Sequence, residues 1–138
     1  MSGVITSGLP NLPRILPPNT TPIIPEQRPY NRPFVTTVAY AASITPNVDT
    51  TDLLVIGTLT GNISIANPAG TPADGQTLVI RFKQDGTGGR TYTMGSSYSF
   101  GTLYTLASWP TTANAYVQAE FRYNATSSKW AHTNRADV

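Results

Sequence analysis

Alternation of large apolar and polar side chains is the dominant pattern between residues 34 and 138. In residues 76–83, for example, Leu78, Ile80 and Phe82 share one parity. Successive side chains of a β-strand point to opposite faces, so a stretch of this kind predicts a strand with one buried face. No window of the chain shows a sustained apolar period of about 3.6 residues, which would indicate an amphipathic helix. The pattern therefore predicts an all-β domain.

Further strands are expected on both sides of this one. Residues 34–44 carry their larger apolar side chains on one parity, and residues 53–56 are apolar at every position, which is typical of a strand covered on both faces. Residues 117–123 alternate again, and turn-forming residues separate them from a last strand over residues 129–133. These two stretches predict a hairpin at the end of the chain.

Two glycine-containing turns predict how other strands are joined. Gly61-Asn62 predicts a hairpin into residues 63–65, and the run 85–89 predicts a reversal into a return strand over residues 90–94. In all, about seven to eight strands are expected. They predict a β-sandwich or jelly-roll-like barrel, because a single open sheet would leave apolar faces and edges uncovered. No internal sequence repeat is apparent.

Proline changes the picture before this domain. Most of the 12 prolines fall within residues 1–33. Each proline lacks a backbone N–H and biases the preceding residue toward extended geometry. We therefore predict two regions: an extended, polyproline-II-like arm over residues 1–33 and the all-β domain over residues 34–138.

Large aliphatic residues recur between the prolines of the arm, unlike in most disordered linkers. Burying them on another molecule would offset the entropy lost on docking, and prolines reduce that loss by restricting the free chain. We therefore expect a docked arm, with a free linker as the alternative. The expected anchors are Ile15, Leu16, Ile23, Ile24 and Tyr30, with Arg14, Arg28 and Arg32 reaching acidic groups of a partner.

Composition and charge narrow the classes of partner. Charged residues make up 12% of the chain, the formal net charge is +2, and no run of Lys or Arg could follow a phosphate backbone, so no nucleic-acid partner is expected. The N-terminus does not resemble a signal peptide, and no apolar stretch approaches the roughly 18 residues that cross a bilayer. We therefore expect synthesis in a cytoplasm and no membrane partner. Cysteine is absent, which excludes disulfides and thiolate metal sites.

Residues able to carry out catalysis or bind metal are few. The only histidine, His132, shares strand parity with Trp130 and is expected at the surface or at an interface. The turn-associated aspartates lack the spacing of a calcium loop and are expected to stabilise turns, namely Asp49, Asp52, Asp74 and Asp85. We therefore expect no catalytic residue, no metal and no cofactor, and we predict that the protein is not an enzyme.

Aromatic residues suggest one alternative chemistry, because exposed rings could stack on sugars. Most of them are expected in the core or at contacts between subunits, namely Tyr92, Tyr98, Tyr104, Trp109, Tyr116, Tyr123 and Trp130. The Gly-rich run 85–90 lacks both the P-loop pattern and a following helix, so a turn is expected there rather than a phosphate site.

Several local motifs occur together over residues 50–135. They are the stretch 67–86 followed by Arg90-Thr91, then Gly95-Ser96, Pro110-Thr111-Thr112, Tyr123-Asn124 and Lys129-Trp130. This set resembles a module of tailed-phage virion proteins, among them fibre-associated and capsid decoration proteins. The resemblance implies a β-rich, homotrimeric module on the exterior of a phage particle.

The main functional hypothesis combines this resemblance with the arm. We predict a structural virion protein of the capsid decoration or cement type on the outer capsid surface, where the arm ties neighbouring subunits together. Its partners would be the major capsid protein or other virion subunits. The alternatives are a tail-fibre or receptor-binding module that recognises host-surface glycans, and a tail or neck adaptor.

Overall fold

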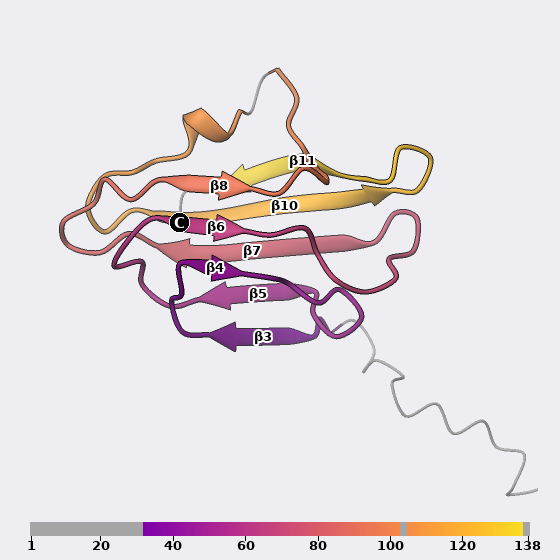
Figure 1. Cartoon of the computed structure of the whole chain (residues 1–138), viewed down its shortest axis with the longest axis horizontal. Helices are drawn as coiled ribbons and strands as arrows, with labels where there is room; N and C mark the ends of the chain where they lie inside the picture. Colours follow the sequence, from indigo (N-terminus) through magenta and orange to yellow (C-terminus); the bar gives the residue numbers. More distant parts are fainter. Residues whose placement is uncertain (1–31, 103–104, 137–138) are drawn as a thin grey trace, which may run out of the picture.

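The computed structural model of the chain describes residues 32–102 and 105–136. These residues are nearly all β, as predicted, and they contain one short 3₁₀ helix, η2 (Leu106–Ser108) (Figure 1). The strands are β3 (Val35–Val38), β4 (Ser43–Ile44), β5 (Leu53–Ile56), β6 (Ile63–Ile65), β7 (Thr77–Lys83), β8 (Tyr92–Met94), β9 (Tyr98–Ser99), β10 (Tyr116–Asn124) and β11 (Lys129–Ala136). In this part of the chain, a helix long and apolar enough to span a bilayer is not found.

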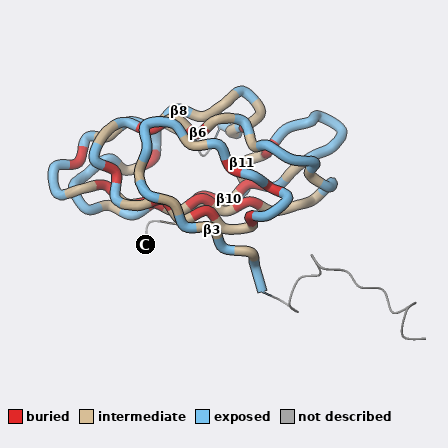
Figure 2. Tube along the Cα trace, turned by 60° about the horizontal axis from the view of Figure 1, so that its bottom comes forward, coloured by how far each residue is buried: buried red, intermediate tan, exposed pale blue. Residues whose placement is uncertain are grey.

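The strands form two sheets that pack face to face. A large sheet has six strands in the order β3-β5-β7-β10-β11-β9, and a small sheet has three in the order β4-β6-β8. Figure 2 shows the two layers, with β6 and β8 on one side of the molecule and β3 and β10 on the other. The predicted all-β sandwich is confirmed in this two-layer form.

Alternating side chains of the central strands build the core. In β7, Leu78, Ile80 and Phe82 are buried, while the residues between them are only partly covered. The inward residues of β10 lie directly opposite, with Phe121 paired to Leu78 and Val117 paired to Phe82. The inward side chains of both strands are almost completely removed from water, so the alternation seen in the sequence specifies the buried face correctly.

The chain winds between the two sheets instead of folding back within one. β3, β5 and β7 belong to the large sheet, whereas β4, β6 and β8, which follow them along the chain, belong to the small sheet. Neighbouring strands among these are parallel, for example β3 with β5 and β4 with β6. Each pair of successive strands is thus one coil, and three coils stack as in a short β-solenoid. We call this arrangement the winding.

Two predicted hairpins are therefore wrong. β5 and β6, on either side of Gly61-Asn62, lie in different sheets, and so do β7 and β8, on either side of residues 85–89. The turn residues do change the direction of the chain. They direct it to the opposite layer, where the next strand pairs with a strand from the previous coil.

The predicted hairpin at the end of the chain is confirmed. β10 and β11 are antiparallel neighbours, and residues 125–128 form the turn between them. Asn124 Oδ1 accepts a hydrogen bond from Ser127 N at 3.1 Å, and Ser128 has a positive φ of 55°. This hairpin lies beside β7, so it covers the third coil on the large-sheet side.

Aspartates tie successive parts of the winding together through backbone N–H groups. Asp49 Oδ1 accepts from Thr71 N at 2.8 Å, and Asp74 Oδ1 accepts from Ala125 N at 2.8 Å. Asp85 Oδ1 accepts hydrogen bonds from Thr87 N and Gly88 N in its own loop. The predicted turn-stabilising role is confirmed for these residues, and the first two also join segments far apart in sequence.

Candidate interaction surface at the open end of the winding

The first coil leaves two edge strands at the same end of the molecule. Among the described strands, β3 ends the large sheet and β4 ends the small sheet, so each pairs with a described neighbour on one side only. We call the surface of residues 34–45, which contains β3, the connection to β4, and β4 itself, the open end. An edge strand presents unpaired backbone N–H and C=O groups to any extended segment that approaches it.

Inward-facing residues of the open end are only partly buried. Val38 is partly exposed, although its register partner Ile56 is 3% exposed. Ile44 is also partly exposed, and its partner Ile65 is 1% exposed. Ile56 and Ile65 belong to the second coil, which has a neighbouring coil on each side, whereas the first coil has a neighbouring coil on one side only within the described residues. Tyr40 packs on the same partly covered margin of the core.

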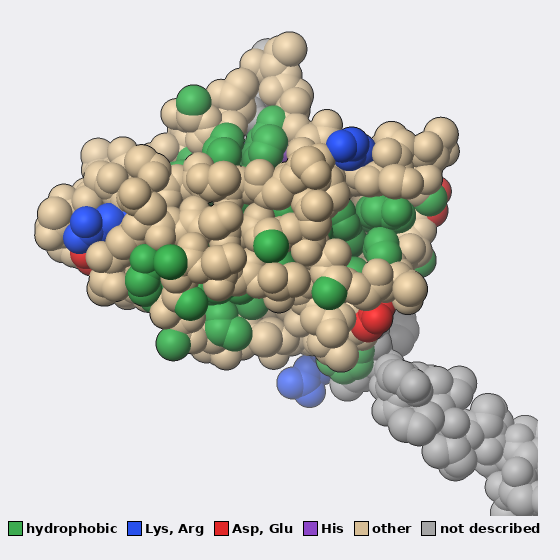
Figure 3. Space-filling model, in the orientation of Figure 1, with side chains coloured by type: hydrophobic (Ala, Val, Ile, Leu, Met, Phe, Trp, Pro, Cys, Tyr) green, Lys and Arg blue, Asp and Glu red, His purple; other side chains and the backbone are tan. Residues whose placement is uncertain are grey.

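The open end lacks two common devices that protect an edge, charge and proline, although its strand β4 is only two residues long. Residues 34–45 contain no charged residue and no proline, and natural sheets commonly place one or the other on an exposed edge strand. In Figure 3, hydrophobic side chains gather over the lower part of the visible face, where β4 runs. This surface could bind an extended apolar segment through side-chain contacts and free backbone groups.

Sequence reasoning did not single out this surface, although a signal for it was present. The run from Phe34 to Thr45 combines strand alternation with a complete absence of charge and proline. That combination indicates either a central strand or an edge with a partner. The sequence alone does not separate the two.

Backbone anchors fix the point where the chain enters the open end. Phe34 N donates to Asp52 Oδ2 at 2.8 Å, and Phe34 O accepts from Asp52 N and Leu53 N. The hydroxyls of Thr36 and Thr51 are 2.7 Å apart. These contacts attach the start of β3 firmly to the second coil.

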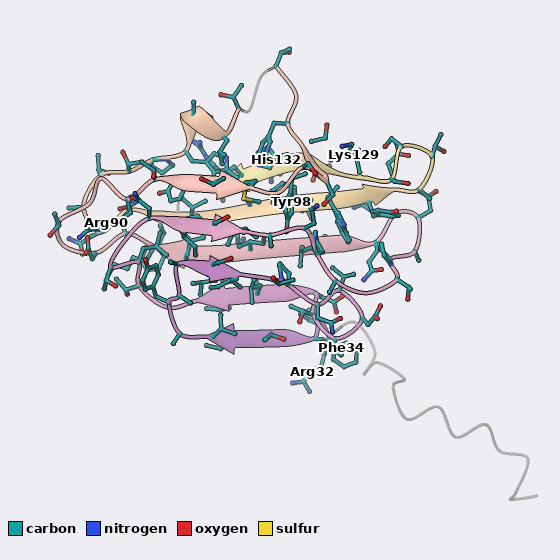
Figure 4. All side chains as sticks on the ribbon, in the orientation of Figure 1. Arg32, Phe34, Arg90, Tyr98, Lys129 and His132 are labelled. Carbon is teal, nitrogen blue, oxygen red and sulfur yellow. The ribbon has the colours of Figure 1, made fainter. Side chains whose placement is uncertain are left out.

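Of the eight residues predicted to bind a partner, the described part of the chain contains Arg32. It is exposed and projects away from the sheets near Phe34 (Figure 4). The other predicted residues lie outside the described residues, namely Arg14, Ile15, Leu16, Ile23, Ile24, Arg28 and Tyr30. Their role as anchors therefore remains a prediction.

Aromatic side chains close the opposite end of the winding. Trp109 is 3% exposed, and its ring lies 6.0 Å from those of Phe82 and Phe100 and 5.7 Å from that of Tyr92. Tyr98 packs edge-on against Phe121, and burial raises the pKa of its phenol. Burial also raises the pKa of Tyr92, although the hydrogen bond from Gln84 opposes that shift. This end is thus a filled aromatic core.

His132 is partly buried and packs against this aromatic core, so it is not the freely exposed surface histidine that was one of the two predicted positions, and the interface position stays a prediction. Its imidazole lies 5.2 Å from the rings of Phe100 and Phe121 and 5.7 Å from that of Trp109. A bulge in the pairing of β10 with β11 falls between Glu120 and Phe121, next to the position where His132 pairs. His132 shares its strand parity with the buried Trp130, and this parity was the sequence signal that indicated an inward position for His132.

Most of the predicted aromatic residues contribute to the core. Tyr98, Trp109 and Trp130 are buried, and Tyr92 and Tyr123 pack against them. Tyr116 is 41% exposed, with Lys83 Nζ 5.2 Å from the centre of its ring. Tyr104 lies outside the described residues. A sugar-stacking platform would need several exposed rings, and among the described aromatic residues Tyr116 offers one.

Charged groups meet in the loop between β7 and β8. Arg90 Nη2 and Asp85 Oδ2 are 2.6 Å apart. The hydrogen bond from Arg90 lowers the pKa of Asp85 most, with further lowering by the N–H groups of Gly88 and Thr87. Asp85 in turn raises the pKa of Arg90. Within the described residues, no group of three or more His, Cys, Asp or Glu side chains is placed to hold a metal ion.

A shallow groove of about 470 Å³ lies near the chain entry, over the large sheet. Pro33 and Leu53 lie on its lining, and so do the outward residues Val79, Arg81 and Gln118 of β7 and β10. Arg81 Nε donates to Gln118 Oε1 at 2.9 Å, so these two polar side chains of the groove partner each other. The groove has the shape of a contact surface more than of a site for chemistry.

A comparison with protein-family models identifies a match. The family model described as putative phage tail fibre C-terminal domain matches residues 40–117, which is more than half of the chain. The matched segment runs from Tyr40, in the open end, through the second and third coils to the beginning of β10. No curated protein matches the chain.

Proposed function

The chain belongs to the phage tail fibre C-terminal domain family, and from this premise we propose that it is a non-enzymatic structural module of the phage tail fibre. A structural role in the virion, in association with other virion components, follows from the family itself. The position on the fibre, the homotrimeric state and the lack of catalytic activity are the finer parts of the proposal.

The family match is the observation that carries this proposal. In the sequence, the resemblance combined with the arm favoured capsid decoration, with a tail-fibre or receptor-binding module and a tail or neck adaptor as alternatives. The matched family favours the tail-fibre alternative, because its description names the tail fibre and the match includes most of the winding. A location on the outer capsid surface has no comparable support.

The open end, a surface of the described residues, is best suited to contact with neighbouring subunits. The open end combines free strand edges with partly exposed apolar side chains. Surfaces of this kind bind extended protein segments, since the edge supplies hydrogen bonds and the side chains supply apolar contact. The exposed ring of Tyr116 by itself is a small basis for glycan recognition.

Location in the particle tests the proposal directly. A short epitope inserted into the exposed turn of residues 125–128 can be detected on intact phage with gold-labelled antibody. We expect label at the tail fibres and a copy number in the tens, measured by quantitative mass spectrometry of purified particles. Label spread over the capsid, with hundreds of copies, would restore the decoration hypothesis.

A glycan array separates attachment from receptor binding. We expect no saturable glycan for the full-length protein. If a glycan did bind, the Tyr116→Ala variant would show whether the exposed ring is responsible. Saturable binding that this substitution abolishes would replace the purely structural role with receptor recognition.

A further inference from the structure

We propose that the open end of one copy is covered by the N-terminal arm of a second copy. The arm's aliphatic residues Ile23 and Ile24 would lie across Val38, Tyr40 and Ile44. This inference rests on the proposed structural role and specifies how subunits of the same kind are joined.

The acceptor surface is defined by the described residues. Within the sheets of the described residues, β3 and β4 have no strand on their outer sides and both belong to the first coil, so one segment that crosses this end can contact both sheets. Val38, Tyr40 and Ile44 pack on the core but keep part of their surface exposed. A covering layer would bury that surface, as the first and third coils on either side of the second coil bury Ile56 and Ile65.

The composition of the arm suits a covering segment that does not allow another strand to pair beyond it. Its aliphatic residues offer apolar surface, while prolines at positions such as Pro22 and Pro25 cannot donate to another strand. Stacked repeats need a terminal cap that covers the apolar end without presenting a new edge. Proline is one of the residues that natural sheets use to end an edge.

The point where the arm joins the domain favours docking of the arm on a second copy over docking on its own copy. The arm joins the domain at Phe34, which hydrogen bonds hold at the start of β3. Pro25, Pro29 and Pro33 favour an extended lead between the anchors and the domain. At about 3.1 Å per residue this lead would be on the order of 25 Å long, which is enough for Ile23 and Ile24 to reach the open end of a neighbouring copy.

Disulfide trapping in the full-length protein tests this arrangement, because the chain contains no cysteine and every introduced thiol is unique. One copy carries Ile23→Cys and a co-expressed copy of different tag mass carries Ala42→Cys, an exposed position in the open end. The matched control replaces Ala42→Cys with Thr93→Cys, an exposed position on β8 at the opposite edge of the small sheet.

After mild oxidation, we expect the Ile23–Ala42 pair to give at least about tenfold more mixed disulfide than the control pair, since docking raises the effective concentration of the two thiols. Equal yields for the two pairs would overturn the proposal. So would a disulfide that forms only within a single chain carrying both Ile23→Cys and Ala42→Cys.

A second measurement remains informative if the thiols align poorly. In the full-length protein, Ile23→Asp combined with Ile24→Asp should speed amide hydrogen exchange in β3 and β4 several-fold and leave β7 unchanged. Unchanged exchange in β3 and β4 would contradict the arm's contact with the open end. Both measurements use purified protein, so their failure is distinct from a failure to find the protein on the tail fibre.

Discussion

A single buried polar side chain, Gln84, shows how individual residues specify the path of the winding. It is fully buried where the chain leaves β7. Its Nε2 donates to Arg90 O at 2.8 Å and to Tyr92 Oη at 2.6 Å, and its Oε1 accepts from Arg90 N at 3.1 Å. The amide therefore joins the end of β7 to the start of β8 in the other sheet.

Removal of this amide should be costly. Gln84→Ala would leave the partly buried backbone groups of Arg90 without their partner and open a cavity at a fully buried position, so we expect the free energy of unfolding to fall by about 2–4 kcal/mol. The control is Gln118→Ala, which removes a partly exposed bond to Arg81 and should cost less than about 1 kcal/mol. Urea unfolding followed by tryptophan fluorescence measures both. Equal losses would contradict the assigned role of Gln84.

The carboxylate of Asp85 should titrate below its ordinary pKa near 3.8, because Arg90 and two backbone N–H groups stabilise its charged form. A group with a lowered pKa stabilises the fold above its unfolded pKa, and that stability is lost as the pH falls through the folded pKa. Arg90→Met should therefore raise the pKa of Asp85 but leave it lowered by Gly88 and Thr87. Carboxyl carbon NMR measures the shift. An unchanged pKa would show that the ion pair does not form in solution.

At the scale of elements, the sequence predicted strands better than it predicted their partners. β7 and β10 were recognisable because Leu78, Ile80 and Phe121 alternate with partly exposed residues. The turns at residues 61–62 and 85–89 were recognised as turns but assigned to hairpins. A turn residue fixes local φ and ψ, whereas the sheet that the chain enters next depends on contacts with an earlier coil.

The loop between β7 and β8 allows a matched test of two adjacent glycines. Gly88 and Gly89 have similar positive φ values of 73° and 76°. A Cβ on Gly88 would lie 2.6 Å from Ala113 N and 2.8 Å from Thr111 O, whereas a Cβ on Gly89 would meet nothing within 4 Å.

We therefore expect Gly89→Ala to cost about 1–2 kcal/mol, the penalty for left-handed backbone alone. Gly88→Ala should cost at least about 1 kcal/mol more, since it also forces apart two segments of backbone. Thermal unfolding of the two variants gives the difference. Similar losses would mean that the contact between this loop and residues 111–113 is loose.

At the scale of the whole molecule, the two ends of the winding differ in a way that no local pattern revealed. One end is filled by Trp109, Phe121 and their aromatic neighbours, whereas at the other end β3 and β4 are the outermost of the described strands. Val35 pairs with Leu53 and Leu53 pairs with Val79, so successive coils contain different numbers of residues. Because the coils differ in length, no sequence repeat marks them. The all-β class was predictable because alternation is local. The winding was not, because parallel pairing joins residues from different coils.

The candidate site divides in the same way between predictable and unpredictable parts. Proline content and aliphatic residues identified the arm from the sequence, but they could not identify an acceptor. The acceptor depends on which strands remain at the edges, and that is a property of the assembled sheets. Val38 and Ile44 look like ordinary core positions until the first coil is seen to have a neighbour on one side only.

Deletion of residues 2–31 separates folding from assembly. All buried hydrophobic residues of the described core lie between Val48 and Trp130, and the anchor from Asp52 to Phe34 survives the deletion. We therefore expect the shortened chain to fold with an unchanged far-ultraviolet circular dichroism spectrum. Its incorporation into phage should fall at least about tenfold, because the apolar contacts of the arm are lost.

The control for this deletion removes residues 2–8, which contain none of the predicted anchors. Phage propagated on each variant would be purified, and the copies per particle counted by mass spectrometry. A shortened chain that folds and yet reaches the particle in normal number would show that the winding alone carries the attachment surface. In that case the open end would have to bind a different virion component, because its edge strands and apolar margin would still need a partner.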